Sequence, residues 1–124
     1  MALFPFEPLS ACALTLMCIG GPATPTDSAL TLATHDVNGS TKTVVLHCDP
    51  AAGNHPSPGE ACAALARADG EFEDLETEDV ACALIYAPVQ ATAHGHWRGE
   101  PVDFETVYPN ACVAGAESSG VFGF

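Results

Sequence analysis

The middle of the chain contains the stretch Val80-Ala81-Cys82-Ala83-Leu84-Ile85-Tyr86-Ala87-Pro88. We expect it to be an extended segment on the surface, centred on an apolar pair, Leu84-Ile85, with a cysteine shortly before the pair and a proline shortly after it. A run of acidic residues precedes the stretch: Asp69, Glu71, Glu73, Asp74, Glu76, Glu78 and Asp79. Charge of this density favours a solvated segment that packs against no core, and an apolar pair there is typical of a surface that another molecule binds. The alternative, which composition alone favours, is that Leu84, Ile85 and Tyr86 begin a buried strand.

The composition describes one small, strongly acidic domain. A chain of 124 residues has room for a single modest core. Its net charge of -13 comes from 16 acidic residues against Lys42, Arg67 and Arg98. Nucleic acids require a basic face that neutralises phosphates, and anionic membranes attract basic segments, so we expect neither as a partner.

The first residues have the features of a secretory signal peptide. Residues 9–19 are apolar but too few to span a bilayer, and Gly21-Pro22-Ala23 resembles a cleavage zone of small residues. Residues 1–8 contain Glu7 and no basic residue, which is unusual for such a peptide. A lipoprotein-type box, Leu9-Ser10-Ala11-Cys12, is the alternative, but little apolar sequence precedes it. We expect residues 1–23 to be removed on secretion, 24–27 to be an unstructured lead-in, and 28–124 to form one domain.

The cysteine content indicates an extracellular protein with disulfides. Six cysteines in so short a chain are typical of an oxidising compartment. Loss of the signal peptide would remove Cys12 and Cys18 and leave Cys48, Cys62, Cys82 and Cys112. Four cysteines allow three pairings, and the sequence pattern alone does not choose among them.

The first half of the mature chain predicts a hairpin and then a helix. Residues 29–33 alternate in hydropathy, Asn38-Gly39 predicts a tight turn because both positions tolerate positive φ, and residues 43–48 form the return strand. The sequence Ser57-Pro58-Gly59-Glu60 predicts a helix start with a capping box. Gly70 should end this helix, and Cys62 and Leu65 should face the core together.

The second half predicts further strands and a second helix. Residues 89–94 form a strand, Gly95 marks a turn, and a following strand buries Val102, Phe104 and Thr106 on one face. Residues 111–116 predict a short helix, and residues 121–124 a last strand. The predicted fold is therefore α+β, an antiparallel sheet of about five strands with two helices packed on one face.

The sequence contains no motif for catalysis, cofactor binding or a metal site. It has no Gly-x-Ser-x-Gly elbow, no His-Glu-x-x-His and no glycine loop for phosphates, so we expect no enzyme activity and no cofactor. The spacing of a zinc site is absent because no CxxC pair occurs among His47, Cys48, His55 and Cys62. His94 and His96 lie close in sequence, but a turn at Gly95 would separate them, so we expect no metal there.

Several ordered segments resemble the subtilisin inhibitor family of Streptomyces. The resemblance covers residues 28–124. It is specific because many separate segments match the family in the same order along the chain. The matching segments are Cys48-Asp49-Pro50, His55-Pro56, Ala61-Cys62, Asp79-Val80-Ala81-Cys82, Tyr86-Ala87-Pro88-Val89, Gly95-His96-Trp97-Arg98-Gly99, Tyr108-Pro109-Asn110-Ala111-Cys112 and Ser119-Gly120-Val121-Phe122-Gly123-Phe124.

The resemblance implies a secreted inhibitor of subtilisin-like, and also chymotrypsin-like, serine proteases. It implies the disulfides Cys48–Cys62 and Cys82–Cys112, a scissile bond at Leu84-Ile85, and a homodimer formed through the exposed sheet face. Asn110 and Pro88 would support the loop, and Ala83 departs from relatives that carry proline there. The residues expected to contact the protease are Val80, Ala81, Cys82, Ala83, Tyr86 and Ala87. The alternative is a small secreted binding domain of the same fold with a partner that is not a protease.

Overall fold

The computed structural model describes residues 28–124. The signal peptide expected over residues 1–23, with Cys12 and Cys18, and the lead-in over residues 24–27 lie outside the described residues. No helix within residues 28–124 combines the length and apolar character that crossing a bilayer requires.

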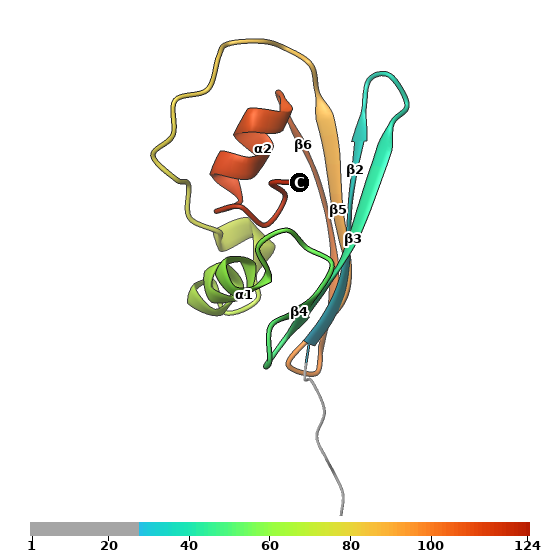
Figure 1. The fold of residues 1–124 in the computed structure, drawn as a ribbon, viewed down its shortest axis with the longest axis vertical. Coiled ribbons are helices and arrows are strands. Elements are labelled where there is room, and N and C mark those ends of the chain that lie inside the picture. The colour runs from blue at the N-terminus through green and yellow to red at the C-terminus, as the bar shows by residue number, and fades with distance from the viewer. Residues whose placement is uncertain (1–27) are drawn as a thin grey trace, which may run out of the picture.

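The described residues form one antiparallel sheet of five strands. The strands are β2 (Ser28–Asp36), β3 (Thr41–Cys48), β4 (Ala52–Gly53), β5 (Val89–Trp97) and β6 (Glu100–Tyr108). They lie in the order β4-β3-β2-β5-β6, and every neighbouring pair is antiparallel (Figure 1). The central pair, β2 and β5, therefore joins segments that are far apart in the sequence.

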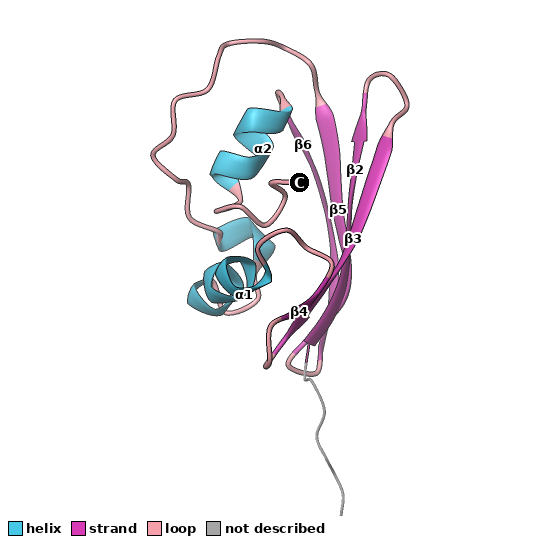
Figure 2. Ribbon diagram, in the orientation of Figure 1, coloured by secondary structure: helices cyan, strands magenta, loops and turns pink. Residues whose placement is uncertain are grey.

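The helices all cover the same face of this sheet. They are α1 (Pro58–Arg67), the short 3-10 helix η2 (Phe72–Asp74) and α2 (Ala111–Glu117). Figures 1 and 2 show them on one side, and no helix of residues 28–124 lies on the other. This arrangement confirms the predicted α+β class, with five strands and two α-helices on one face.

The core lies between the sheet and the helices. The side chains that point inward from the strands alternate with exposed ones, as the hydropathy pattern of β6 predicted for Val102, Phe104 and Thr106. Phe122, from the C-terminal segment, is buried at the centre. The residues buried around it include Leu30, Leu32, Val44, Leu46, Ala61, Leu65, Ala91, Ala93, Trp97 and Val121.

The acidic run is partly packed on the core, contrary to our expectation. Phe72 lies in the middle of the run and is buried. Its ring stacks on Phe104 with centroids 5.2 Å apart and lies 5.9 Å from Phe122. The flanking carboxylates remain exposed, so burial of one aromatic ring offsets the preference of this segment for water. Phe72 thereby fixes the chain just before the loop that carries Leu84.

The hairpin predicted at Asn38-Gly39 is present between β2 and β3, and the Gly39 amide donates to the Asp36 carbonyl at 3.1 Å, but the turn does not have positive φ at both positions. At the β2–β3 connection only Gly39 has positive φ, at 84°, and the Asp36 carboxylate accepts hydrogen bonds from the Asn38 and Ser40 amides, both 2.9 Å long. The turn with positive φ at both positions is Arg98-Gly99, with φ of 47° and 86°, between β5 and β6. Positive φ at both positions is the geometry that fits the twist of a hairpin.

Gly95 does not lie at a turn, so the prediction that the chain turns there is wrong. It lies inside β5, opposite Leu30 of β2, and the strand continues to Trp97. A Cβ atom at Gly95 would lie 2.1 Å from the carbonyl oxygen of Ala29. The glycine therefore allows two backbones to approach closely, rather than allowing the chain to reverse.

The predicted helix over residues 58–67 is present, but its capping box is not. Ser57 is the N-cap of α1 and Pro58 its first residue, yet the Ser57 side chain makes no capping hydrogen bond. The Ser57 amide donates instead to Nδ1 of His55, at 2.9 Å. At the other end, the Gly70 amide donates to the Leu65 carbonyl at 2.8 Å, and Gly70 has φ of 77°, as a glycine that ends a helix requires.

The last strand predicted over residues 121–124 does not form. The segment turns back on itself, with the Val121 amide donating to Ser118 O and the Gly123 amide to Gly120 O. Val121 and Phe122 are buried in the core, where a strand of this length could not place two consecutive side chains. The hydrophobic signal was therefore correct, and the secondary structure assigned to it was wrong.

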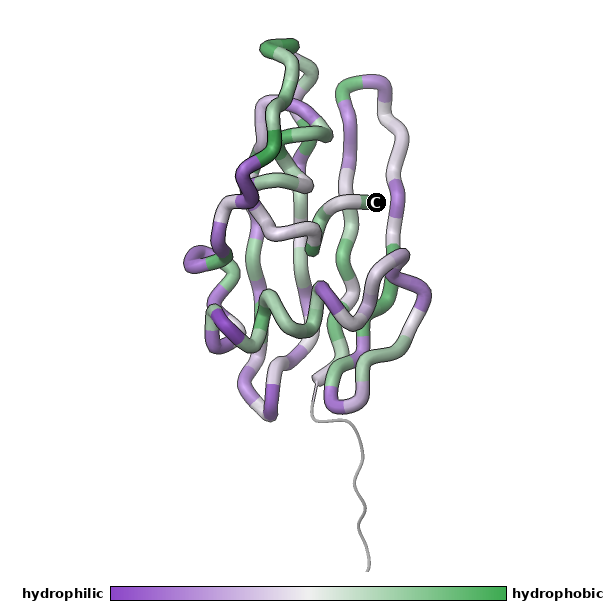
Figure 3. The backbone as a smooth tube through the Cα atoms, turned by 60° about the vertical axis from the view of Figure 1, so that its left-hand side comes forward, coloured by the Kyte–Doolittle hydropathy of each residue, from purple (hydrophilic) through white to green (hydrophobic). Residues whose placement is uncertain are grey.

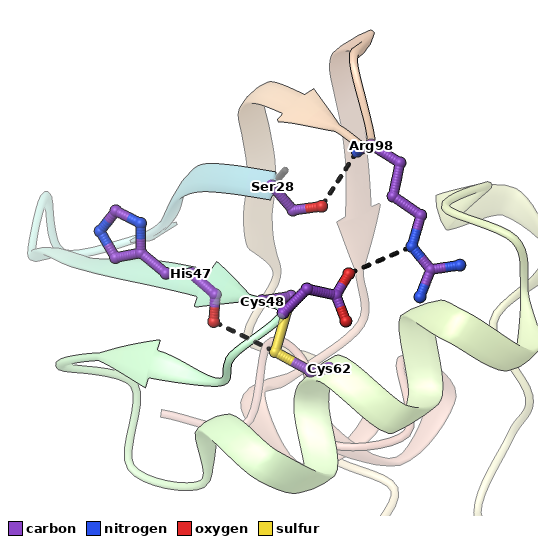
Figure 4. Close-up of polar contacts among 6 residues, drawn as sticks. Ser28, His47, Cys48, Cys62 and Arg98 are labelled. Atoms are coloured by element: carbon purple, nitrogen blue, oxygen red, sulfur yellow. Dashed lines mark hydrogen bonds and ion pairs between the residues drawn. A yellow bond between two sulfur atoms is a disulfide. The ribbon is translucent and has the colours of Figure 1, made fainter. Parts of the chain in front are cut away.

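The first disulfide joins the end of β3 to α1. Cys48 and Cys62 are bonded, and Sγ of Cys62 lies 3.2 Å from the His47 carbonyl oxygen (Figure 4). Beside it, Oγ of Ser28 accepts a 3.0 Å hydrogen bond from the Arg98 amide, and Nε of Arg98 donates to Asp49 at 3.2 Å. These contacts fix the end of the sheet that lies away from the Leu84 loop.

Candidate functional site

Residues 75–88 form a long loop that contains the apolar pair singled out in the sequence. No residue of this 75–88 loop is in a helix or strand. It leaves η2, passes over α2 and enters β5 (Figure 1), and its tip is coloured hydrophobic in Figure 3. The exposed fractions of Leu84, Ile85 and Tyr86 are 103%, 62% and 80%. The alternative of a buried strand beginning at Leu84 is therefore wrong.

Asn110 connects the tip of the loop to the body of the protein. Its side-chain Nδ2 donates to the carbonyl oxygens of Ala83 and Ile85, at 3.3 and 2.7 Å, on the two sides of Leu84. Its Oδ1 accepts from the Val113 amide at 2.9 Å and so caps α2. One buried side chain therefore stabilises the start of a helix and orients two peptide groups of the loop.

A disulfide fixes the loop two residues before Leu84. Cys82 is bonded to Cys112, the second residue of α2, with their Cα atoms 5.7 Å apart. Both pairings that the resemblance implied are thus present in the structure. Beyond Leu84, the Ala87 amide donates to the Pro109 carbonyl at 2.8 Å, and Pro88 restricts the backbone where the loop joins β5.

The backbone at Leu84 is a sharp local turn, whereas we expected an extended segment. The Ile85 amide donates to the Ala83 carbonyl at 2.9 Å, which closes a turn of three residues around Leu84. The turn places the Leu84 side chain outward, with no contact that shields it from water. The Asn110 hydrogen bonds hold the peptide groups on either side of Leu84, while the Leu84 side chain itself is fully exposed.

Two residues that the sequence reasoning missed hold the acidic end of the loop. Oγ of Ser119 donates to the Glu76 carbonyl at 2.5 Å, and the Glu78 amide donates to the Ala116 carbonyl at 2.7 Å. Ser119 has φ of 54°, a conformation rare for serine, which marks a constrained turn after α2. Ser119 lies in a segment that matched the family, but nothing in the sequence connects it to residue 76.

The histidines and cysteines considered for a zinc site do not converge. Cys48 and Cys62 are joined to each other, and His55 is buried with Nε2 at 2.9 Å from the Val121 carbonyl. Because Nδ1 of His55 accepts from the Ser57 amide, Nε2 carries the proton and donates. Within residues 28–124 no group of three or more His, Cys, Asp or Glu side chains is arranged to hold an ion.

A hollow of about 430 Å³ lies between η2 and the β5–β6 hairpin, away from the loop. Its lining includes Phe72, Trp97 and Arg98 and several exposed carboxylates. The face of Trp97 is already occupied, because the Arg98 guanidinium carbon lies 4.8 Å from its ring centroid. None of the residues of the 75–88 loop lines this hollow. The candidate site is therefore the convex loop and not a cavity.

Comparisons with known proteins find similar sequences and a similar solved structure. The profile of a family described as subtilisin inhibitor-like matches residues 24–110. The subtilase-type protease inhibitor of Streptomyces fradiae is 40% identical over 106 residues, which are 81% of this chain and 75% of that protein. The subtilisin inhibitor of Streptomyces albogriseolus is 42% identical over 85 residues, or 67% of this chain. The match spans 59% of the length of that relative.

The structural comparison agrees with the sequence comparisons. A chain in the crystal structure of Streptomyces caespitosus sermetstatin in complex with Bacillus licheniformis subtilisin superposes with a TM-score of 0.61 and 27% identity. The superposition covers 78% of this chain and 96% of that one. The fold described above is thus shared with a protein of known structure.

Proposed function

The chain belongs to the subtilisin inhibitor-like family, and on that basis we propose that it inhibits serine proteases of the subtilisin type by occupying their active site with the 75–88 loop. The observation that carries the proposal is the tip of this loop. Leu84 is fully exposed, while the carbonyl groups of Ala83 and Ile85 on either side are both bonded to Asn110. Such a side chain is available to a partner, and its backbone is already ordered.

On this proposal the bond presented for cleavage is Leu84-Ile85. Leu84 fills the primary specificity pocket, and its size and lack of charge suit the apolar pockets of subtilisin-like and chymotrypsin-like enzymes. A trypsin-like pocket requires a cation, which no residue of the 75–88 loop supplies. Residues on either side add backbone hydrogen bonds to an edge of the protease, in the manner of an added strand. These are Val80, Ala81, Cys82, Ala83, Tyr86 and Ala87.

On this proposal the protein inhibits the protease, instead of being cleaved and released as a substrate, because its loop is rigid. A flexible peptide loses conformational entropy when it binds, at about 1–2 kcal/mol for each residue whose backbone is fixed. The Cys82–Cys112 bond, the Asn110 hydrogen bonds and Pro88 restrict the loop before it binds. Only the turn at Leu84 must open for strand-like pairing, and this costs one hydrogen bond, about 1 kcal/mol. Most of the interaction energy is therefore retained as affinity.

This function requires no catalytic residue in the chain itself. The protease supplies the nucleophile and the base, and the chain supplies a peptide bond that is held in place. Two features support this assignment over an enzyme: the family of the chain is one of protease inhibitors, and the exposed loop is convex. The same loop gives no reason to prefer the alternative of a binding domain with another kind of partner.

The compartment and the assembly follow from the same proposal. The target enzymes are secreted, so the chain is secreted as well, with residues 1–23 as its signal peptide and residues 28–124 as its inhibitory domain. The two disulfides support an oxidising compartment. The chain forms a homodimer through the face of the sheet that no helix covers, where Val45 and Val107 are exposed. The 75–88 loop lies on the helical side and remains free in such a dimer.

Titration of subtilisin with the purified protein tests the proposal. Stoichiometric loss of protease activity is expected, with one inhibitory domain bound per enzyme molecule. The matched control is Leu84→Asp, which changes one fully exposed side chain and so leaves the fold unaltered while it places a charge in an apolar pocket. If subtilisin remains fully active while it digests the wild-type chain, the proposal is wrong.

A further inference from the structure

The hollow between η2 and the β5–β6 hairpin lies at the free edge of the sheet. β6 is the end strand in the order β4-β3-β2-β5-β6, so no other described strand pairs with its outer side. The lining includes the consecutive residues 100–104 of β6, whose side chains point alternately to the two faces of the sheet. The hollow therefore extends along the edge of the strand, where unpaired amide and carbonyl groups are available to an added strand.

The walls of this hollow combine apolar surface with negative charge. Phe72 and Phe104 stack on each other there, with ring centroids 5.2 Å apart. Asp103 also lines the hollow but is already paired with His94 at 3.1 Å. The exposed carboxylates of the lining that form no ion pair within residues 28–124 are Asp69, Glu71, Glu73 and Glu100. Apolar surface rimmed by carboxylates suits a lysine or arginine side chain, whose methylene groups pack while its charged end stays at the rim.

A buried hydrogen-bond donor in the wall lacks an acceptor. Nε1 of Trp97 is the one buried side-chain polar atom of the described residues without a partner, and Trp97 is only 4% exposed. A Cβ atom at Gly70, which also lines the hollow, would lie 2.8 Å from Nε1, so no side chain at position 70 covers this part of the indole. The Arg98 guanidinium over the ring face is itself a donor. An acceptor for Nε1 must come from another molecule, and a peptide carbonyl is a suitable one.

We propose that the hollow and the outer side of β6, together called the β6 edge, bind an extended cationic segment of another protein. The segment pairs with β6 as an added strand and places a lysine or arginine side chain in the hollow. Its backbone supplies a carbonyl oxygen to Nε1 of Trp97. The carboxylates attract such a segment, whereas a second copy of this chain, with its net charge of -13, would bring more negative charge to the same edge.

The β6 edge is separate from the 75–88 loop and from the proposed dimer interface. None of the residues 75–88 lines the hollow. A second copy on the helix-free face would lie above the plane of the sheet, whereas the hydrogen-bonding groups of an edge strand point outward within that plane. Binding at the β6 edge therefore does not depend on the proposed function, and both can be measured in the same variants.

Fluorescence titration of the purified protein with synthetic peptides tests the β6 edge, because Trp97 is the only tryptophan of the chain. A peptide of alternating lysine and valine with blocked ends should bind saturably and change the Trp97 emission. A glutamate–valine peptide of the same length should not bind. Methylating the backbone nitrogens of the lysine peptide removes the donors for strand pairing and should weaken its binding at least about tenfold.

Charge variants locate the bound peptide. Glu73→Gln and Glu100→Gln should each weaken binding of the lysine peptide about two- to fivefold, as loss of an exposed ion pair does. Glu60→Gln is the matched control, since it removes one exposed carboxylate from α1, outside the hollow. Unchanged thermal unfolding shows that each variant is folded, whether or not the chain inhibits subtilisin.

Three results would overturn the proposal. The first is the absence of a saturable change in Trp97 emission with the lysine peptide. The second is equal weakening by Glu60→Gln and Glu73→Gln, which would show that the peptide responds only to the net charge of the protein. The third is equal affinity for the methylated and unmethylated lysine peptides, which would show that no strand is added to β6.

Discussion

Nδ2 of Asn110 lies 2.7 Å from the carbonyl oxygen of Ile85, and through this contact the stability of a helix and the shape of the candidate loop depend on one side chain. The amide is suited to both tasks because its oxygen accepts from α2 while its nitrogen donates to the loop. No other uncharged side chain of this size supplies an acceptor and two donors in one plane. The two tasks can be separated by substitution.

We predict that Asn110→Asp preserves the helix and damages the loop. The carboxylate can still accept from the Val113 amide, but it cannot donate to Ala83 or Ile85 and repels both carbonyl groups. Loss of each of these two hydrogen bonds costs about 1 kcal/mol, so inhibition of subtilisin should weaken at least about tenfold. Asn110→Ala should lower the unfolding free energy by about a further 1 kcal/mol through loss of the cap. Equal inhibition constants for Asn110→Asp and wild type would contradict this role.

Opening the Cys82–Cys112 bond should turn the protein from an inhibitor toward a substrate. Both of these cysteines retain exposure, whereas Cys48 of the other disulfide is fully buried, so a mild reductant should open Cys82–Cys112 first. The double variant Cys82→Ser with Cys112→Ser isolates the same change without reductant. It should be cleaved by subtilisin within the 75–88 loop and lose about 3–4 kcal/mol of stability.

Cleavage is measured by mass spectrometry during incubation with the protease. Cys48 and Cys62 remain bonded in this variant, which keeps the sheet and α1 joined and provides the internal control. A reduced or doubly substituted protein that resists cleavage as long as wild type would show that the bond does not stiffen the loop.

Replacing Leu84 with lysine should redirect the protein toward trypsin-like enzymes. The side chain is fully exposed, so Leu84→Lys should not alter the unfolding free energy by more than about 0.5 kcal/mol. A cation at this position suits the acidic pocket of trypsin and is poorly accepted by an apolar one. Tyr86→Lys is the control, since it adds the same charge two residues away. Inhibition constants for subtilisin and trypsin that shift equally in both variants would disprove the assignment of Leu84.

Ser119→Ala should loosen the acidic end of the loop without affecting its tip. The variant removes the hydrogen bond to the Glu76 carbonyl and leaves the contacts of Asn110 intact. Faster amide hydrogen exchange is expected at Glu78, whose amide is bonded to Ala116, with a smaller loss of inhibition than for Asn110→Asp. Glu117→Gln, an exposed change in the same segment, is the control. Unchanged exchange at Glu78 would show that Ser119 does not hold the loop.

Tyr108 should ionise only at high pH while the protein is folded. Burial, and to a lesser degree the charge of Glu117, raise the pKa of the Tyr108 phenol above its ordinary value of 10.0. Above that value the unfolded chain loses the proton while the folded state keeps it, so the unfolding free energy should fall as the pH rises. Tyr86→Phe leaves Tyr108 as the single tyrosine, and its tyrosinate absorbance then reports this ionisation alone. A midpoint at or below the ordinary value would contradict the raised pKa.

Local sequence patterns predicted the elements well and their connections less well. The alternation in β6 and the sequence Ser57-Pro58 located a strand and a helix correctly, because both signals depend on neighbouring residues. Gly95 was misread because a glycine can serve a turn or a close approach of backbones, and only the register of β2 and β5 distinguishes the two. Phe72 was hidden within the acidic run for the same reason, since its partners Phe104 and Phe122 are distant in sequence.

The candidate site was foreseeable in part. Residues 80–88 stood out as an exposed apolar pair between a cysteine and a proline, and the family resemblance drew attention to Asn110. The contact of Ser119 with residue 76 could not be foreseen, because it depends on how the chain folds back after α2. The turn at Leu84 could not be foreseen either, because Asn110, which bonds the carbonyl groups on both sides of Leu84, is distant in sequence.

The central pairing of β2 with β5 has a consequence for what remains after the Leu84-Ile85 bond is cut. The break would lie between these two strands, so neither fragment contains a complete sheet. The pieces share the Cys82–Cys112 bond and the ladder that pairs residues 29–36 with residues 89–96, and so would stay together as a two-chain protein. The newly formed amino and carboxyl groups would remain neighbours, held where the peptide bond between them can form again.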